Sequence, residues 1–217
     1  MRIAQLTPGT GNFHCGSCMR DNAMVNALRD MGHDALMIPM YLPTVLDEPG
    51  HEDRHIYYGG INVFLEQKGG LLGKLSRWLQ NKLDSPKLLN WAAGRSDMTK
   101  PRDLGEITLS MLRGEEGKQL AELDKLVAHL RDDLRPDIVC LSNVLLTGLA
   151  RGIRERLNVP VVCTMHGEHS FLDDLPEPYN PQAWEILRRR AAEGDAFVAV
   201  SRYYGDPVRD GLALRDG

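Results

Sequence analysis

The sequence has few cysteines, few aromatic residues and no long apolar run. Four cysteines in 217 residues are too few for the disulfide framework of a small secreted domain. No apolar stretch approaches the roughly 18–20 residues that a membrane-spanning helix needs. The apolar run at the N-terminus is too short for a signal peptide, since proline and glycine follow at positions 8 and 9. We therefore expect a cytoplasmic protein.

The composition is that of a globular protein, with 42% hydrophobic and 26% charged residues. The net charge of −4 argues against nucleic acid as a partner. Charge is also segregated, because residues 67–102 hold eight basic side chains and only two acidic ones. The length fits one large domain with an insertion at about 67–102.

Short apolar runs alternate with helical patterns along the chain. The runs Ile138–Leu141 and Val161–Cys163 are apolar on both faces, which is typical of parallel strands covered by helices. We predict an α/β fold: a doubly wound, mostly parallel Rossmann-like sheet with helices on both faces. The predicted strands are 2–6, 35–41, 137–141, 160–165 and 196–200. The predicted helices include one with Met24, Ala27, Leu28 and Met31 on its buried face, a long one over 105–134, one over 146–157 and one over 181–193. A turn is expected at residues 58–61.

Ligands bind beyond the carboxyl ends of the strands in such sheets. The glycine-rich loop after the first strand offers backbone N–H groups at a helix N-terminus, which suit an anion or a sugar. Its candidate residues are Gly11, Asn12, Cys15 and Gly16. The loop is neither a dinucleotide fingerprint, because His14 stands where the third glycine belongs, nor a P-loop. A merely tight strand-to-helix turn is the alternative.

Three further loops follow predicted strands and supply candidate side chains. His166 at the end of the fourth strand can hydrogen-bond a hydroxyl or take its proton near neutral pH. Asn143, Glu168 and Ser201 occupy corresponding positions and are candidate cleft residues. The alternative for each is a solvated polar loop.

Cys15 and Cys18 form a Cys-x-x-Cys pair, which is a redox motif or half of a metal site. Cys140 and Cys163 fall within apolar strands, so only His14 and His166 could complete a tetrahedral set. We predict no metal site here and keep a Cys-x-x-Cys redox or metal protein as an alternative function.

Residues 70–83 place leucines and Trp78 on one helical face, with Lys74, Arg77 and Lys82 off that face. This pattern is typical of an interfacial helix attracted to anionic lipid. An insertion that packs its apolar face on the domain is the alternative.

Four segments in this order resemble the N-terminal half of glycosyltransferase family 4 enzymes, which have the two-domain GT-B fold. The first is strand 2–6 with its glycine loop ending at Gly16. The others are Arg135–Asn143, similar to a "pDivh" strand; Val159–Glu168, similar to a "vPvv.t.H" strand; and Gly194–Ser201, similar to an "aD.vvavS" strand. The sequence departs from the family at the usual Gly-Gly of the first loop, which is replaced around Cys15-Gly16.

The resemblance implies a hexosyltransferase-type enzyme that moves a sugar from a nucleotide-sugar donor to a sugar or lipid-linked acceptor. It implies retention of anomeric configuration and no obligatory metal or other cofactor. The N-terminal domain would hold the acceptor, with Gly11–Gly16 near the donor phosphates and His166 lining the cleft. The family's donor-binding domain has no counterpart within the 217 residues, so we expect this chain alone to be inactive. A stand-alone ligand-binding domain is the alternative, and an amphipathic helix at 70–83 would suit a lipid acceptor at the inner membrane face.

Overall fold

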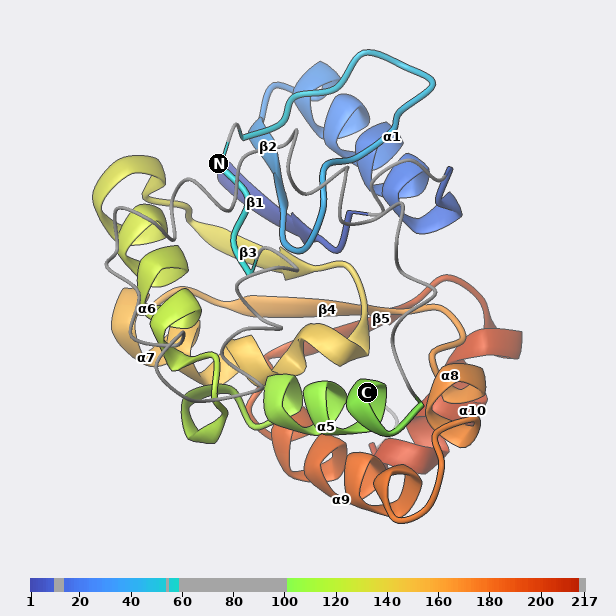
Figure 1. Cartoon of the computed structure of the whole chain (residues 1–217). Helices are drawn as coiled ribbons and strands as arrows, with labels where there is room; N and C mark the ends of the chain where they lie inside the picture. The colour runs from blue at the N-terminus through green and yellow to red at the C-terminus, as the bar shows by residue number, and fades with distance from the viewer. Residues whose placement is uncertain (10–13, 54, 59–100, 215–217) are drawn as a thin grey trace.

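A computed structural model describes residues 1–9, 14–53, 55–58 and 101–214 (Figure 1). Five parallel strands form one sheet: β1 (Arg2–Thr7), β2 (Asp34–Pro39), β3 (Ile138–Leu141), β4 (Val161–Met165) and β5 (Ala196–Ala199). Their order is β2-β1-β3-β4-β5, and Leu6 pairs with both Ile38 and Leu141. This register brings the carboxyl ends of the central strands together, and it confirms the Rossmann-like α/β prediction.

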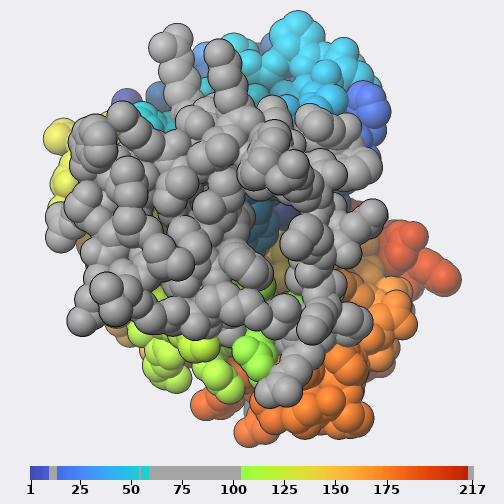
Figure 2. Space-filling model, in the orientation of Figure 1, coloured from blue at the N-terminus to red at the C-terminus, as the bar shows by residue number. Residues whose placement is uncertain are grey.

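Helices cover the two faces of the sheet unequally. Helix α1 (Gly16–Asp30) packs on one face, where Val25 meets Ile3, Ala35 and Met37. Across the opposite face lie α5 (Pro101–Leu112), α6 (Leu120–His129), α7 (Ala150–Leu157), α8 (His169–Asp173), α9 (Tyr179–Ala191) and α10 (Arg202–Leu212). Alternate residues of β1, such as Ala4 and Leu6, belong to this larger core. Figure 2 shows the same orientation as a surface, with the segment after β2 (cyan) at the top and α9 (orange) at the lower right.

The prediction of one long helix over 105–134 is wrong. The structure has two helices there, α5 and α6, with the 3-10 turn η3 (Gly114–Glu116) between them. The break occurs at Gly114, whose φ of +56° is accessible to glycine at little cost. A Cβ on Gly114 would lie 2.0 Å from the carbonyl oxygen of Gly148. Close approach of two backbones therefore ends α5. A π-helical turn, η4 (Leu130–Leu134), follows α6.

The apolar face predicted for the first helix is confirmed only in part: Leu28 packs against the core between α1 and the sheet. Met31 is 73% exposed, whereas Cys18, Asp21, Asn22 and Val25 are buried. Two of these buried residues are polar and have hydrogen-bond partners, because Asp21 accepts from Thr7 and Asn22 donates to the carbonyl of Glu48. Apolar periodicity alone could not identify such a face.

The insertion at 67–102 overlaps the described chain only at Pro101 and Arg102, the start of α5, and the predicted turn at 58–61 only at Tyr58. The amphipathic stretch with Lys74, Arg77, Trp78 and Lys82 lies outside the described residues. Within the described ranges, no helix is both long and apolar enough to cross a bilayer.

Helix α6 provides a matched test of the core, because Leu123 is fully buried and Leu120, one turn earlier, is 38% exposed. Leu123→Ala should lower the free energy of unfolding by about 2–5 kcal/mol, since it removes buried methyl groups and leaves a cavity. Leu120→Ala should cost about 1 kcal/mol or less. Urea unfolding followed by circular dichroism measures both, and equal losses would contradict the burial of Leu123.

Candidate functional site

The sheet reverses its winding between β1 and β3. Helix α1 leaves β1 on one face, whereas the helices around β3 and β4 occupy the other. In doubly wound sheets such a switch point forms a crevice at the carboxyl ends of the strands, and ligands bind there. The structure brings Thr7, Ser142 and His166, which end or follow three neighbouring strands, together with the first turns of α1.

The backbone carbonyl of Ser142 joins these strand ends. It lies 2.7 Å from Nε2 of His166 and 3.3 Å from Nη2 of Arg20. A carbonyl can only accept, so Nε2 of His166 carries the proton that forms this bond. In the neutral ring, Nδ1 is then an acceptor, and it faces Oγ of Ser17 at 3.4 Å.

A buried carboxylate, that of Asp21, links Arg20 to the end of β1. Asp21 is fully buried, and it accepts from the hydroxyl of Thr7 at 2.8 Å and from Nε of Arg20 at 3.2 Å. The sequence prediction missed Thr7, Ser17, Arg20 and Asp21. The signal that could have found them is the i, i+3 and i+4 spacing of Ser17, Arg20 and Asp21 on one face of a helix that opens at a strand end.

Two polar atoms at this switch point are buried and lack a hydrogen-bond partner among the described residues: Nη1 of Arg20 and Oγ of Ser142. Most buried polar groups in proteins are paired, and a buried donor left unpaired costs free energy. The switch point therefore holds a guanidinium nitrogen and a hydroxyl whose hydrogen-bonding capacity the described residues leave unused.

Glu168 shapes the turn that presents His166. One carboxylate oxygen accepts from the amide of His166 at 2.9 Å and the other from the amide of Val144 at 3.1 Å. Gly167, which lies between His166 and Glu168, has a φ of +106°, and a Cβ there would come within 2.8 Å of the Tyr204 ring. Glu168 thus acts on the backbone of the β4 and β3 loops.

Asn143 and Ser201 both cap helical segments. The side-chain oxygen of Asn143 accepts from the amide of Leu145 at 3.1 Å, opening the 3-10 helix η5 (Val144–Leu149). The hydroxyl of Ser201 accepts from the amide of Tyr204 at 3.4 Å at the start of α10. Both bonds are N-caps, in which a side-chain oxygen accepts from a backbone amide of the first turn.

The Cys-x-x-Cys pair opens α1, with Cys15 at the N-cap position and Cys18 fully buried. Burial disfavours the Cys15 thiolate, but hydrogen bonds from Cys18 and Ser17 outweigh it and lower the pKa of Cys15. Burial, reinforced by the neighbouring Cys15, raises the pKa of Cys18 to about 12. Among the described histidines and acidic residues, none joins this pair in a metal-ligating group. Gly16 follows Cys15 as the first, exposed residue of α1, and Gly11 and Asn12 lie outside the described residues.

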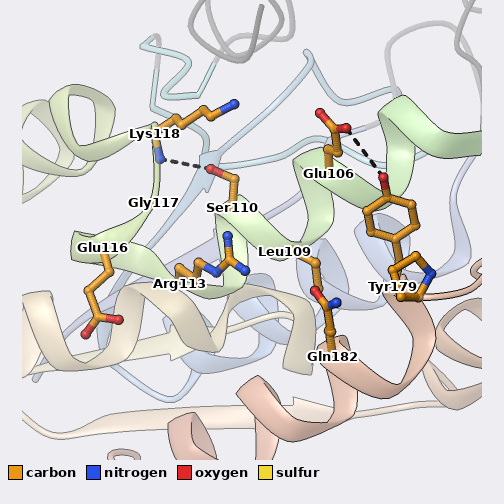
Figure 3. A pocket seen from close by; sticks show the side chains of 10 residues that line it. Glu106, Leu109, Ser110, Arg113, Glu116, Gly117, Lys118, Tyr179 and Gln182 are labelled. Atoms are coloured by element: carbon orange, nitrogen blue, oxygen red, sulfur yellow. Dashed lines mark hydrogen bonds between the residues drawn. The ribbon is translucent and has the colours of Figure 1, made fainter.

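A separate cavity of about 440 Å³ lies between α5 and the start of α9 (Figure 3). Its lining includes Glu106, which accepts from the Tyr179 hydroxyl at 3.4 Å, and Ser110, which accepts from the amide of Lys118 at 2.9 Å. It contains none of the residues at the strand ends. We place the candidate site at the β1–β3 switch point because the polar network of His166, Arg20 and Ser142 lies there.

The all-parallel sheet, with helices on both faces and a switch point between β1 and β3, defines a Rossmann-like α/β domain. The family model for Glycosyltransferase Family 4 matches residues 93–215, which is more than half of the chain. The chain therefore belongs to glycosyltransferase family 4, whose members transfer sugars from a donor to an acceptor. Comparison with curated proteins gives no match. The family match covers β3, β4 and β5 with His166, Glu168, Asn143 and Ser201, and it begins after the glycine loop.

The pKa differences predict selective alkylation of Cys15. Its lowered pKa leaves more thiolate at pH 7.5 than at Cys18 or at Cys140, whose pKa burial raises to about 11. Because the thiolate is the nucleophile, iodoacetamide should label Cys15 first. Peptide mass spectrometry over a time course measures this, with Cys15→Ser as the control. Equal labelling of Cys15 and Cys140 would contradict it.

Proposed function

We propose that residues 1–217 form the acceptor-side domain of a retaining glycosyltransferase of the hexosyltransferase type. It would move a sugar from a nucleotide-sugar donor to an acceptor hydroxyl, without an obligatory metal. The observation that carries the proposal is the arrangement at the switch point: an imidazole fixed by the Ser142 carbonyl, beside two buried polar atoms that lack partners. Sugars carry many hydroxyl groups, which can hydrogen-bond to an imidazole, a guanidinium and a serine hydroxyl.

His166 would contact the acceptor or the transferred sugar through Nδ1. The 2.7 Å bond to Ser142 holds Nε2, so the ring orientation is set before any ligand arrives. The contact between Nδ1 and Ser17 is long, at 3.4 Å, and a sugar hydroxyl that donates to Nδ1 would replace it readily. Preorganised contacts of this kind lower the entropic cost of holding a substrate in a reactive position.

The donor phosphates would approach the first loop and the start of α1. Arg20 supports this placement, because its guanidinium reaches the Ser142 carbonyl while Nη1 stays unpaired. Backbone amides at a helix N-terminus favour an anion in the same region. In this proposal a second domain holds the nucleotide, and residues 1–217 by themselves bind acceptor without transferring sugar.

Sugar transfer tests the proposal. The proteins are residues 1–217 and the longest reading frame that contains them, and the donors are UDP-, GDP- and ADP-activated hexoses with soluble and lipid-linked sugar acceptors. The long protein should form product with retained configuration, read by mass and proton NMR, and residues 1–217 should form none. His166→Ala should reduce kcat/KM of the long protein about 100-fold or more.

The matched control is His33→Ala. His33 lies between α1 and the amino end of β2, away from the carboxyl ends of the strands, and its amide donates to the carbonyl of Leu28. This variant should retain activity. Product with inverted configuration, or turnover by residues 1–217 alone, would overturn the mechanism or the domain assignment respectively. Acceptor binding without transfer by the long protein would support a stand-alone ligand-binding domain.

We also propose a lipid-linked acceptor and a cytoplasmic protein bound peripherally to the inner membrane face. The support is the basic amphipathic pattern of residues 70–83. Several basic residues near an anionic surface each contribute about 1 kcal/mol of attraction. Vesicles containing phosphatidylserine should carry the wild type upward in flotation and leave the Lys74→Glu, Arg77→Glu, Lys82→Glu variant behind. Equal flotation would exclude this role.

The contrast between the two thiols favours a second candidate, redox control at the crevice. A reactive Cys15 beside a protonated, buried Cys18 is the arrangement of dithiol motifs at helix N-termini. With added diamide as the oxidant, which takes up two hydrogen atoms, a Cys15–Cys18 disulfide would make the protein two hydrogen atoms lighter in intact mass. Cys18→Ser would prevent this change.

A further inference from the structure

A second group of polar side chains lies where the segment after β2 meets the end of α6. Asp53, His55 and His129 form what we call the His–Asp cluster, and their ligand atoms all lie within 4.8 Å of one another. Nε2 of His129 is 2.8 Å from one carboxylate oxygen of Asp53, and Nδ1 of His55 is 3.0 Å from the other. Two imidazole nitrogens and a carboxylate therefore converge on one point.

The cluster has the outer contacts that orient metal ligands. Nδ1 of His129 lies 2.8 Å from a carboxylate oxygen of Asp133, one helical turn further on. A metal-bound histidine commonly directs its other nitrogen to a carboxylate, which fixes the ring and raises its basicity. Tyr57 stacks on the same ring, with centroids 5.5 Å apart.

The two ring nitrogens of His129 suit a metal ligand that has an outer contact. Both face carboxylates, yet a neutral imidazole has a single N–H. With a metal ion bound by Nε2, the N–H at Nδ1 would donate to Asp133, and both nitrogens would have a partner.

We propose that the His–Asp cluster binds a divalent transition-metal ion, with Zn²⁺ the best match. The ligands would be a carboxylate oxygen of Asp53, Nδ1 of His55 and Nε2 of His129, and a water would complete the tetrahedron. Zn²⁺ takes His nitrogens and Asp oxygens at about 2.0–2.2 Å, so the ligand atoms of a tetrahedral ion lie roughly 3.3–3.5 Å apart. The ligand atoms of the cluster already lie within 4.8 Å of one another. His55 can adjust, because its side chain is 71% exposed, whereas Asp53 and His129 are held at 9% and 12%.

The position of the cluster suggests a structural role separate from sugar transfer. His129 ends α6, and η4 then leads to the amino end of β3, whereas the candidate crevice lies at the carboxyl ends of the strands. Asp53 is joined to the sheet edge through its amide, which donates to the carbonyl of Met37 at 2.7 Å. A bound ion would tie the segment after β2 to α6. This inference does not depend on the proposed function.

Zinc titration of the purified, chelator-treated chain tests it. Isothermal calorimetry and competition with a chromogenic chelator should find one Zn²⁺ per chain, and Zn²⁺ should raise the melting temperature. Co²⁺ in its place should give the intense visible absorption of a four-coordinate site. His55→Ala changes an exposed side chain, so it should fold normally and weaken zinc binding tenfold or more.

Asp133→Asn tests the outer contact and should weaken binding by about 10-fold to 100-fold. The matched control is His51→Ala, because His51 lies in the same segment outside the cluster and should leave binding unchanged. Absence of zinc binding, or equal losses in His51→Ala and His55→Ala, would overturn the proposal. Circular dichroism of each variant verifies that the comparison is between folded proteins.

Discussion

The carbonyl oxygen of Ser142 is the acceptor on which the candidate site depends. It receives hydrogen bonds from the side chains that follow β4 and open α1, and its own residue follows β3. One backbone atom thus fixes the relative positions of three elements that are far apart in sequence. The buried Asp21 extends the network to β1 through Thr7. Removing any one donor would leave buried polar groups unpaired, and the others would have to move.

Most polar side chains at the switch point are held in place by hydrogen bonds to the backbone. Glu168 has both oxygens engaged by backbone amides, and Asn143 and Ser201 cap helical segments. These residues fix the loops that follow β3, β4 and β5, and the loops after β3 and β4 fix the ring of His166. Arg20 and Ser142 each keep a polar atom that has no partner among the residues the structure describes. Specificity for a ligand would then come from a small number of groups whose geometry is set in advance.

The parallel sheet was predictable from the sequence, because apolar runs such as Ile138–Leu141 pack on both faces of a sheet that helices cover. The carboxyl-end rule then led directly to His166 and its neighbours. The polar face of α1 was not predictable, because Asp21 and Asn22 are buried through partners distant in sequence, Thr7 and Glu48. The break between α5 and α6 was missed for a similar reason: it depends on contact between Gly114 and the distant Gly148. The pairing of Asp53 with His129 spans 76 positions and has no local signal.

That glycine contact also has a consequence for how the protein can change during evolution. A methyl group on Gly148 would meet the carbonyl of Met111 at 2.1 Å, just as one on Gly114 would meet the Gly148 carbonyl. The end of α5 therefore fixes how closely η5 approaches it, and η5 begins directly after Ser142 and Asn143. Substitutions at this pair, remote from any ligand, would shift the carbonyl that holds His166. In a library of random variants selected for activity, we expect Gly114 and Gly148 to tolerate change only when both positions, or the α5–η5 spacing, change together.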